Sequence, residues 1–373
     1  MDKIIRYILV FIGVLTFTNV AVSQVTVYKG GDYGSKFYRI PAIVTASDGT
    51  LVTVADKRIE HNGDLPAKID VVSRRSFDNG LTWEPYVTVA SHDSIGGCGD
   101  AALVIDQKSG DIIAIFSHGN GFWGNTPAHI SVARSNDNGL TWSAMTDINP
   151  QILTTDPNGA QPIKCNSAFA TSGRALQLKD GRIMFALVTR NVDSPFFKVY
   201  VVYSDDGGYN WKVSRTPGSS DGDESKIVEL SDGSLIMSVR NRYRSEKYNN
   251  RRLFSRSFDR GETWSEMCPV EDIVDPACNG EIITAEYCGK EVVLHSSPGS
   301  TDKREKVTIY ASLDGGKTFP YSKVACEGGS AYSSMTMTAD GMVGILIEED
   351  ASDGEGFDLV FRKIPLAEIL NEN

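Results

Sequence analysis

The chain has 373 residues and a formal net charge of −11 at pH 7. This acidic balance argues against nucleic acid as a partner, because phosphate binding needs a basic surface. It does not exclude a small anionic substrate, because a few converging arginines set the local field. No linker rich in proline, glycine or serine divides the chain, so residues 24–373 are expected to form one domain.

The first 23 residues are predicted to be a secretory signal peptide. Residues 1–6 carry basic side chains, residues 7–17 form a short apolar run, and residues 18–23 end in Ala-Val-Ser. The apolar run is too short to span a bilayer comfortably, and no later stretch is long and apolar enough. We expect cleavage after Ser23 and an exported chain, periplasmic or secreted, with no membrane span. The alternative is a leader that stays attached as an anchor.

Two early strand-like stretches carry arginines where apolar residues prevail. Arg39 lies inside Phe-Tyr-Arg-Ile-Pro at residues 37–41, and Arg58 follows the run at 51–57. A lone arginine in such a place usually extends its head group to water at a sheet edge.

An octapeptide of the pattern Ser-x-Asp-x-Gly-x-Thr-Trp then recurs along the chain. Its copies occupy residues 76–83, 135–142, 204–211, 257–264 and 312–319. The third copy has Asn210 in place of threonine, and the fifth ends in Phe319 instead of tryptophan. Five such copies at similar spacing indicate a structural repeat.

Each octapeptide has the chemistry of a hairpin turn. Aspartate accepts bonds from nearby N–H groups, glycine permits positive φ, and the closing aromatic residue can pin the turn onto a sheet. The four intervals between copies average 59 residues, so the 350 residues after the leader correspond to about six units. The sequence therefore predicts an all-β fold, a six-bladed β-propeller with one blade that lacks an octapeptide.

Two later arginines also lie next to apolar, strand-like runs. Arg240 ends the apolar run at 235–239, and Arg304 precedes the run at 307–310. Residues from separate blades converge near the axis of a propeller, where several arginines would form a clamp for a carboxylate. Because Lys303 and Lys306 flank Arg304, a solvated charge cluster is the alternative there.

The six cysteines do not form a recognisable framework. Six cysteines allow 15 disulfide pairings, and none here has the paired spacing of a zinc site. We expect buried free thiols, no metal and no cofactor. The cysteines are Cys98, Cys165, Cys268, Cys278, Cys288 and Cys326.

The Tyr-Arg-Ile-Pro motif followed by several such octapeptides, called Asp boxes, resembles the bacterial-type exo-α-sialidases (neuraminidases) of glycoside hydrolase family 33. The resemblance covers essentially the whole mature chain, with the motifs in the same order. It implies a monomeric hydrolase (EC 3.2.1.18) that removes terminal sialic acids from glycoproteins, glycolipids and oligosaccharides. Boxes alone would be weak support, because other propellers contain them.

The resemblance also implies roles for individual residues. Arg39, Arg240 and Arg304 match the triad that grips the sialic acid carboxylate. Tyr332, in Ala-Tyr-Ser-Ser, matches the nucleophile, and Glu224, in Asp-Glu-Ser-Lys, matches the carboxylate that activates it.

Four further residues match supporting positions. Asp64, in His-Asn-Gly-Asp, resembles the acid/base, with Asp70 as the competing candidate. Glu348 resembles the residue that orients the first arginine. Arg58 and Asp100 match the pair that faces the 4-hydroxyl of the sugar. A separate suggestion is that Phe122 and Trp123 line a pocket for the N-acyl group or simply pack together.

The chemistry is reasonable without the family name. A sialoside carries a carboxylate on its anomeric carbon, so an anionic nucleophile would approach against like charge, whereas a neutral tyrosine would not. Because a free phenol has a pKa of about 10, a partner base must remove its proton. A carboxylic acid must also protonate the departing oxygen, a contribution of roughly 10²–10⁴-fold.

Three alternatives remain beside a retaining exo-α-sialidase. A trans-sialidase would use the same site with a sugar as acceptor, and would need an aromatic platform at the rim. A non-catalytic sialic acid lectin would not need Tyr332, Glu224 and Asp64. A hydrolase of neutral glycans would have no use for the arginine cluster.

Overall fold

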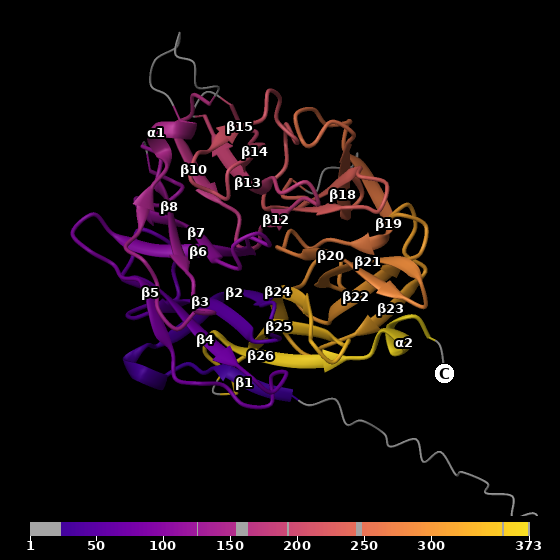
Figure 1. Ribbon diagram of the computed structural model, residues 1–373, viewed down its shortest axis with the longest axis horizontal. Helices are drawn as coiled ribbons and strands as arrows, with labels where there is room; N and C mark the ends of the chain where they lie inside the picture. The colour runs from indigo at the N-terminus through magenta and orange to yellow at the C-terminus, as the bar shows by residue number, and fades with distance from the viewer. Residues whose placement is uncertain are drawn as a thin grey trace, which may run out of the picture.

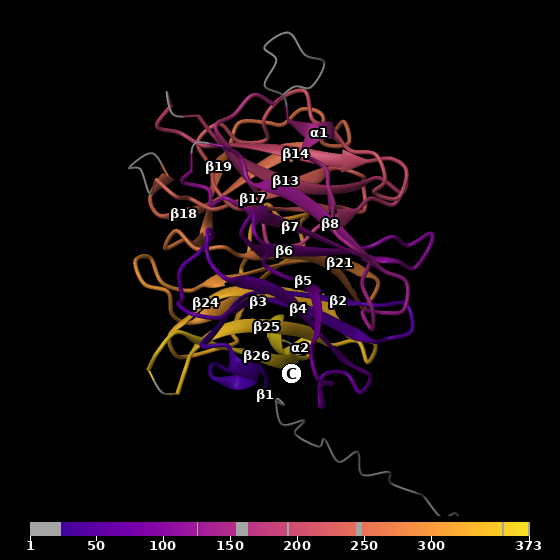
Figure 2. The same ribbon diagram turned by 90° about the vertical axis from the view of Figure 1, so that its left-hand side faces the viewer.

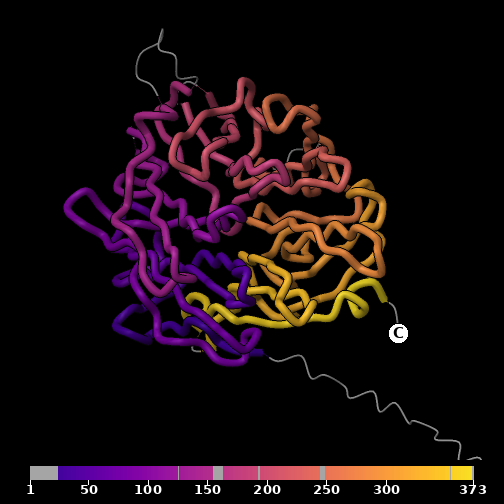
Figure 3. Tube along the Cα trace, in the orientation of Figure 1, coloured from indigo at the N-terminus to yellow at the C-terminus, as the bar shows by residue number. Residues whose placement is uncertain are grey.

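Six sheets follow one another around a common axis. The computed structural model describes residues 24–124, 126–153, 163–191, 194–243, 248–352 and 354–371. The chain circles the axis once, from the indigo sheet at the lower left of Figure 1 to the yellow sheet at the bottom, and Figure 3 traces the same path. The prediction of an all-β, six-bladed propeller is confirmed. The predicted leader, residues 1–23, lies outside the described residues.

Blades 1 to 3 come from the first half of the described chain. Blade 1 consists of β2 (Phe37–Thr45), β3 (Leu51–Arg58), β4 (Ile69–Ser76) and β5 (Val87–Ala90). Blade 2 consists of β6 (Gly97–Ile105), β7 (Ile112–Gly119), β8 (His129–Ser135) and β9 (Thr146–Asp147), with β11 (Gly173–Arg174) added beside β6. Blade 3 consists of β10 (Ser167–Ala170), β13 (Ile183–Arg190), β14 (Lys198–Ser204) and β15 (Lys212–Val213), with β12 (Leu176–Gln177) paired to β13.

Blades 4 to 6 complete the ring. Blade 4 consists of β16 (Ser225–Glu229), β17 (Leu235–Val239), β18 (Arg251–Ser257) and β19 (Cys268–Val274). Blade 5 consists of β20 (Glu281–Tyr287), β21 (Lys290–Pro298), β22 (Val307–Ser312) and β23 (Tyr321–Val324). Blade 6 consists of β24 (Ser330–Met337), β25 (Val343–Asp350), β26 (Phe357–Ile364) and β1 (Gln24–Tyr28).

The helices that lie wholly within the described residues are three short pieces. They are the 3₁₀ turn η1 (Asp32–Gly34) and the helices α1 (Asn149–Ile152) and α2 (Leu366–Ile369). The helix α2 follows the last strand, and its Leu366 and Ile369 are buried. None of the helices in the part of the chain described here is long and apolar enough to cross a membrane.

The blades stack face to face, so their central strands are buried on both sides. Figure 2 shows blades 3, 2, 1 and 6 as successive layers. Strand β7, for example, reads Ile-Ile-Ala-Ile-Phe-Ser-His-Gly and is buried along its whole length. Neighbouring blades cover both of its faces, which is why the run is almost continuously apolar instead of alternating.

The ring is closed by pairing its first strand with its last. Strand β1 runs antiparallel to β26, with Gln24 opposite Arg362 and Val25 opposite Phe361. The indigo β1 and yellow β26 lie together at the bottom of Figure 1. The fourth strand of blade 6 therefore comes from the other end of the chain, and no hairpin is needed there. This explains why one blade lacks an octapeptide.

Each octapeptide joins the third and fourth strands of its blade. In the copy at 257–264, Ser257 Oγ donates to Asp259 Oδ1 (2.9 Å) and accepts the Gly261 N–H (2.9 Å). Asp259 also accepts both the N–H (2.9 Å) and the hydroxyl (2.6 Å) of Thr263. Gly261 has φ 85°, a conformation that favours glycine. The turn thus satisfies its own polar groups.

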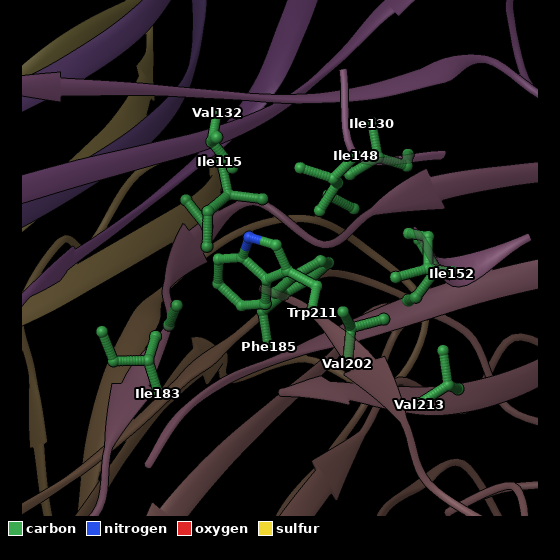
Figure 4. Packing of buried hydrophobic residues seen from close by; sticks show 14 of the residues in the cluster. Ile115, Ile130, Val132, Ile148, Ile152, Ile183, Phe185, Val202, Trp211 and Val213 are labelled. Carbon is green, nitrogen blue, oxygen red and sulfur yellow. The ribbon is translucent and has the colours of Figure 1, made fainter. Parts of the chain in front are cut away.

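The closing aromatic residues pack between blades. Trp211 of blade 3 meets Phe185 with ring centroids 5.4 Å apart, within an apolar cluster that includes Ile115 and Val132 of blade 2 (Figure 4). Trp83 likewise contacts Phe361 of blade 6, with centroids 5.5 Å apart. Each turn is therefore fixed onto the preceding blade, as expected for large apolar side chains.

The six cysteines are free, as the sequence analysis predicted, but they are not uniformly buried. Cys98, Cys278 and Cys326 are buried, whereas Cys268 and Cys288 are exposed. The expectation of buried thiols was wrong for these two. Cys268 begins the outer strand β19, and Cys288 occupies the tight turn between β20 and β21 with φ 50°.

Candidate active site

One end of the propeller carries a cavity of about 850 Å³, counting its space open to solvent. Seven of the nine residues predicted for the site line it, and they come from blades 1, 2, 4, 5 and 6. These are Arg39, Asp64, Asp100, Glu224, Arg240, Arg304 and Tyr332. The other two, Arg58 and Glu348, lie behind the cavity wall and contact lining residues instead. The competing acid, Asp70, is not among the lining residues and accepts bonds from His92.

Arg39 is held in place by Glu348 across the junction of blades 1 and 6. Its Nε and Nη2 donate to the two carboxylate oxygens at 3.0 and 2.9 Å. Glu348 is fully buried and also accepts the N–H groups of Ile40 (2.8 Å) and Tyr332 (3.2 Å). Burial raises the pKa of Glu348, but the charge and bonds of Arg39 outweigh it and the net direction is downward. The ionised carboxylate thereby aligns Arg39 with the strand that carries Tyr332.

Tyr332 lies against a carboxylate and an arginine from blade 4. Its hydroxyl donates to Glu224 Oε2 at 2.7 Å and accepts from Arg240 Nη1 at 3.2 Å. Arg240 Nη1 also donates to the same Glu224 oxygen at 2.5 Å. A phenol with a base on one side and a cation on the other is arranged to lose its proton during a reaction.

Burial and the nearby Glu224 charge hold the pKa of Tyr332 well above its usual value, although Arg240 and Arg304 oppose them. The phenol is therefore neutral in the free protein at ordinary pH. Ionisation has to be coupled to proton transfer onto Glu224, which is within hydrogen-bonding reach.

Three guanidinium groups surround Tyr332. The Cζ atoms of Arg39 and Arg304 lie 5.2 and 5.6 Å from the centroid of the Tyr332 ring, and Arg240 contacts its hydroxyl. Arg304 is fixed at its far side by donating from Nη2 to the Ala277 carbonyl (3.2 Å). Burial lowers the pKa of Arg240, but the charges of Asp223, Tyr332 and Glu224 raise it further, so the group stays charged. The structure thus brings the predicted triad together.

Asp64 lies at the mouth of the cavity on the loop between β3 and β4. Its side chain is 73% exposed, and Oδ1 pairs with Arg58 Nη2 at 2.8 Å. Arg58 also donates from Nη1 to the carbonyl of Asn62 (2.7 Å), so it braces this loop from beneath. The loop rests on blade 2, where a Cβ at Gly121 would overlap the carbonyl of Leu65. This placement suits a group that exchanges protons with a departing or entering oxygen.

Asp56 is a site residue that the sequence reasoning missed. It is fully buried, pairs with Arg58 (3.1 Å) and accepts the Asp100 N–H (3.0 Å). Burial raises the pKa of Asp56 to about 6, and burial with the charge of Asp56 raises the pKa of Asp100 well above its usual value. The two acids thus share a site in which one of them is easily protonated. Because residues two apart in a strand share a face, the spacing of Asp56 from Arg58 was the available signal.

An aromatic wall forms the side of the cavity opposite the Arg39–Glu348 pair. Phe122, Trp123 and Phe197 line it, and Trp123 is 64% exposed. The ring centroids of Phe122 and Phe197 are 4.9 Å apart, so these side chains also pack against each other. Arg242, which was not predicted, lies over Trp123 and Phe197 at 5.3 and 4.7 Å.

Asp223, also missed, ties Arg242 to the rest of the site. It accepts from Arg242 Nη1 at 3.0 Å and lies 3.8 Å from Arg240 Nε. Its position next to Glu224 in sequence was the signal for it. No group of three or more potential metal ligands is gathered anywhere in the described residues.

The comparisons with known proteins agree on one family. The model of the BNR repeat-like domain matches residues 60–345. A sialidase from Micromonospora viridifaciens is 34% identical over 345 residues, covering 85% of this chain and 50% of that protein. The chain thus spans about half the length of this relative.

Solved structures give the same picture. The chain resembles the Hadza microbial sialidase Hz136 with a TM-score of 0.81 and 31% identity, covering 93% of this chain and 69% of the other. A leech intramolecular trans-sialidase complexed with 2,7-anhydro-Neu5Ac has a TM-score of 0.76 at 19% identity, covering 95% and 72% of the two chains. At that identity the likeness concerns the fold alone.

Proposed function

This chain belongs to the sialidase family, and from that premise we propose that it is a retaining exo-α-sialidase acting on sialylated glycans. The observation that carries the proposal is the contact of the Tyr332 hydroxyl with Glu224 (2.7 Å), inside a ring formed by Arg39, Arg240 and Arg304. The arginines supply bidentate donors for the substrate carboxylate, which a neutral glycan lacks.

In the first half of the proposed reaction, Glu224 Oε2 takes the phenolic proton while the Tyr332 oxygen bonds to the anomeric carbon. The bond from that carbon to the leaving oxygen breaks, and Asp64 in its acid form gives its proton to that oxygen. A covalent glycosyl-tyrosine results. Its formation places no new negative charge against the substrate carboxylate.

In the second half, water attacks the anomeric carbon and Asp64 takes the proton of that water. The bond to the Tyr332 oxygen breaks, and the phenol recovers its proton from Glu224. Two displacements at one carbon retain the configuration, so the first product is the α anomer of sialic acid.

The test compares a fluorogenic sialoside with neutral aryl glycosides. We expect release from the sialoside only, and a loss of about 10³-fold or more in kcat for Tyr332→Phe, because the nucleophile is gone. Activity of the variant equal to that of the wild type would remove Tyr332 from its role. Hydrolysis of the neutral glycosides would instead show that activity does not require a substrate carboxylate bound by the three arginines.

Transfer to a sugar or within the substrate is the second candidate. The exposed Trp123 at the cavity offers an aromatic face to an acceptor, and the leech structure of the same fold is an intramolecular trans-sialidase. Proton NMR of the reaction with sialyllactose, with and without added methyl β-galactoside as acceptor, distinguishes the three products. We expect free sialic acid as the main product, whereas 2,7-anhydro-Neu5Ac or a new sialoside would favour transfer. The intact Tyr332–Glu224 pair weighs against a non-catalytic lectin.

A further inference from the structure

A buried ion pair beneath the cavity joins the supports of two of the three arginines. Asp275 follows β19, on the segment that leads from the rim of blade 4 to the first strand of blade 5. Its partner Arg252 lies in β18, at 3.2 Å between Nη1 and Oδ2, and both side chains are 0% exposed. Burying two charges is costly and carries no net stability by itself, so a buried pair calls for another reason to be present.

The first contact of Asp275 is with the loop that carries Arg240. Its Oδ2 accepts the N–H of Asn241, the residue after Arg240, at 2.9 Å. Arg240 itself is bound through its own N–H to the carbonyl of Glu224 at 3.0 Å. The main chain is therefore fixed on both sides of the Arg240 Cα, by Glu224 before it and by Asp275 after it.

The second contact of Asp275 is with the support of Arg304. Its Oδ1 accepts the N–H of Cys278 at 3.0 Å, while Arg252 Nη1 donates to the Cys278 carbonyl at 2.8 Å. These bonds hold the preceding residue, Ala277, at φ 59°, an uncommon conformation for a residue with a Cβ. In that conformation the Ala277 carbonyl accepts from Arg304 Nη2 at 3.2 Å.

We propose that Asp275, paired with Arg252, is a positioning residue that sets Arg240 and Arg304 relative to each other for one carboxylate. The inference rests on the proposed function, since it assigns a task to the same arginines. One carboxylate has two oxygens, and here each oxygen holds the main chain of a different arginine support. Arg240 and Arg304 must contact the same ligand carboxylate. Because the main-chain supports of both are bound to Asp275, less conformational entropy is lost when the two arginines are ordered on binding.

The decisive variant is Asp275→Asn, because an amide of equal size has only one acceptor oxygen. Whichever way the amide turns, one of the two main-chain N–H groups then faces an NH₂ group. The matched control is Asp272→Asn on the same segment of chain. Asp272 accepts a main-chain N–H across the same blade junction, from Phe319 at 2.7 Å, but lines no part of the cavity.

The readout is competitive inhibition by free sialic acid and by its C1 carboxamide, measured against an aryl sialoside. The two ligands differ only in the group that the arginines bind. For Asp275→Asn we expect the affinity for the acid to fall about tenfold and that for the carboxamide to change less than about twofold, as for weakened hydrogen bonds to a charged group. The Asp272→Asn variant should change neither constant.

Equal losses for the acid and the carboxamide would show general damage to the fold and overturn the positioning role. Undiminished preference for the acid in Asp275→Asn would overturn it as well, with the sialidase proposal left standing. Wild-type protein that binds both ligands equally would overturn the carboxylate grip itself, and the positioning role with it.

A second variant covers the case in which Asp275→Asn does not fold, since it leaves Arg252 buried without a counter-ion. The double variant Asp275→Asn/Arg252→Gln removes both charges together, which costs less stability than removing one. It should show the same selective loss of affinity for the acid. A double variant that folds and still discriminates as the wild type does would count against the proposal.

Discussion

The two ends of the propeller handle their charged groups in opposite ways. At the end with the octapeptides, the aspartate at the third position of each octapeptide is satisfied within its own eight-residue turn, as Asp137 is by Ser135 and Thr141. At the cavity end, two of the central contacts join residues from different blades, Arg39 with Glu348 and Tyr332 with Glu224. Arg39 and Glu348 are 309 residues apart in sequence, and Tyr332 and Glu224 are 108 apart.

The contacts that stabilise the octapeptide turns therefore join residues close in sequence, whereas the contacts that form the cavity join residues far apart in sequence. Removing an aspartate at the octapeptide end disturbs one turn. Removing the Glu348 carboxylate at the cavity end leaves Arg39 without its partner at the junction of two blades. The following predictions test this contrast, from the largest expected effect to the smallest.

The largest effect is expected for Glu348→Gln. The variant removes the fully buried charge that pairs with Arg39, which is itself 12% exposed, so the free energy of unfolding should fall by about 3–5 kcal/mol, as for a broken buried pair. Urea denaturation followed by tryptophan fluorescence measures it. The control is Glu349→Gln, whose carboxylate makes two bonds to Arg362 but is 13% exposed, so the loss should be smaller, about 1–2 kcal/mol. Similar losses for the two neighbours would contradict the contrast.

The variant Asp64→Asn should act on rate and not on stability. An amide cannot donate the proton that a sugar leaving group needs, so kcat/KM for sialyllactose should fall by about 10²–10³-fold. For an aryl sialoside, whose phenol leaves with little help, the loss should be below about tenfold. Asp70→Asn, the competing candidate that binds His92 instead, should leave both rates unchanged. A uniform loss on both substrates would remove Asp64 from proton transfer.

The pH dependence of stability should report the buried Asp56. Its pKa in the folded protein is raised to about 6, mainly by burial, so the folded state binds this proton more tightly than the unfolded chain does. The stabilisation from this proton is present at low pH and is lost as pH rises from about 4 to about 6. Asp56→Asn lacks this loss and also removes the charge that raises the pKa of Asp100, so its stability relative to the wild type should increase by about 2 kcal/mol or more between pH 4 and pH 7.

Thermal unfolding of both proteins across that pH range measures the difference. A constant difference between Asp56→Asn and the wild type at all pH values would mean that Asp56 titrates normally. Burial raises the pKa of Asp137, but hydrogen bonds from Thr141 and Ser135 outweigh it and the net direction is downward. The stability of Asp137→Asn relative to the wild type should therefore not increase between pH 4 and pH 7.

The smallest effect is expected for Asp137→Ala at the opposite end. The turn loses its bonds to Thr141 and Ser135, but these groups remain near water, so the cost should be about 1–2 kcal/mol. The kcat and KM for the sialoside should stay at wild-type values. A change in KM would mean that the two ends are coupled through blade 2.

The same contrast explains what could be predicted from the sequence. The six blades followed from the octapeptides, because eight consecutive residues contain all the donors and acceptors of the turn. The positions of Arg39, Arg240, Arg304 and Tyr332 were available from short motifs. Their partners were less accessible, since no spacing along the chain reveals that Asp275 meets both Asn241 and Cys278.

Burial was the least predictable property. Cys268 and Cys288 were expected to be buried, but both are exposed. Cys268 begins the outer strand β19, and Cys288 lies in the turn between β20 and β21. In the other direction, Asp56 and Arg252 are charged residues that strand patterning alone would put at the surface, yet both are buried. Each is buried because a partner from the same blade neutralises it, and that pairing is a property of the assembled sheet.

The pairing of β1 with β26 closes the ring by non-covalent contacts, namely the hydrogen bonds between the strands and the apolar packing of Val27 and Tyr28. The first strand is synthesised long before the last. Strand β1 therefore lacks its pairing partner β26 until about 330 further residues have been synthesised. The reaction centre shares this delay, since Arg39 on blade 1 meets Glu348 only when blade 6 docks. The protein therefore acquires its binding pocket in the same step that seals its circumference.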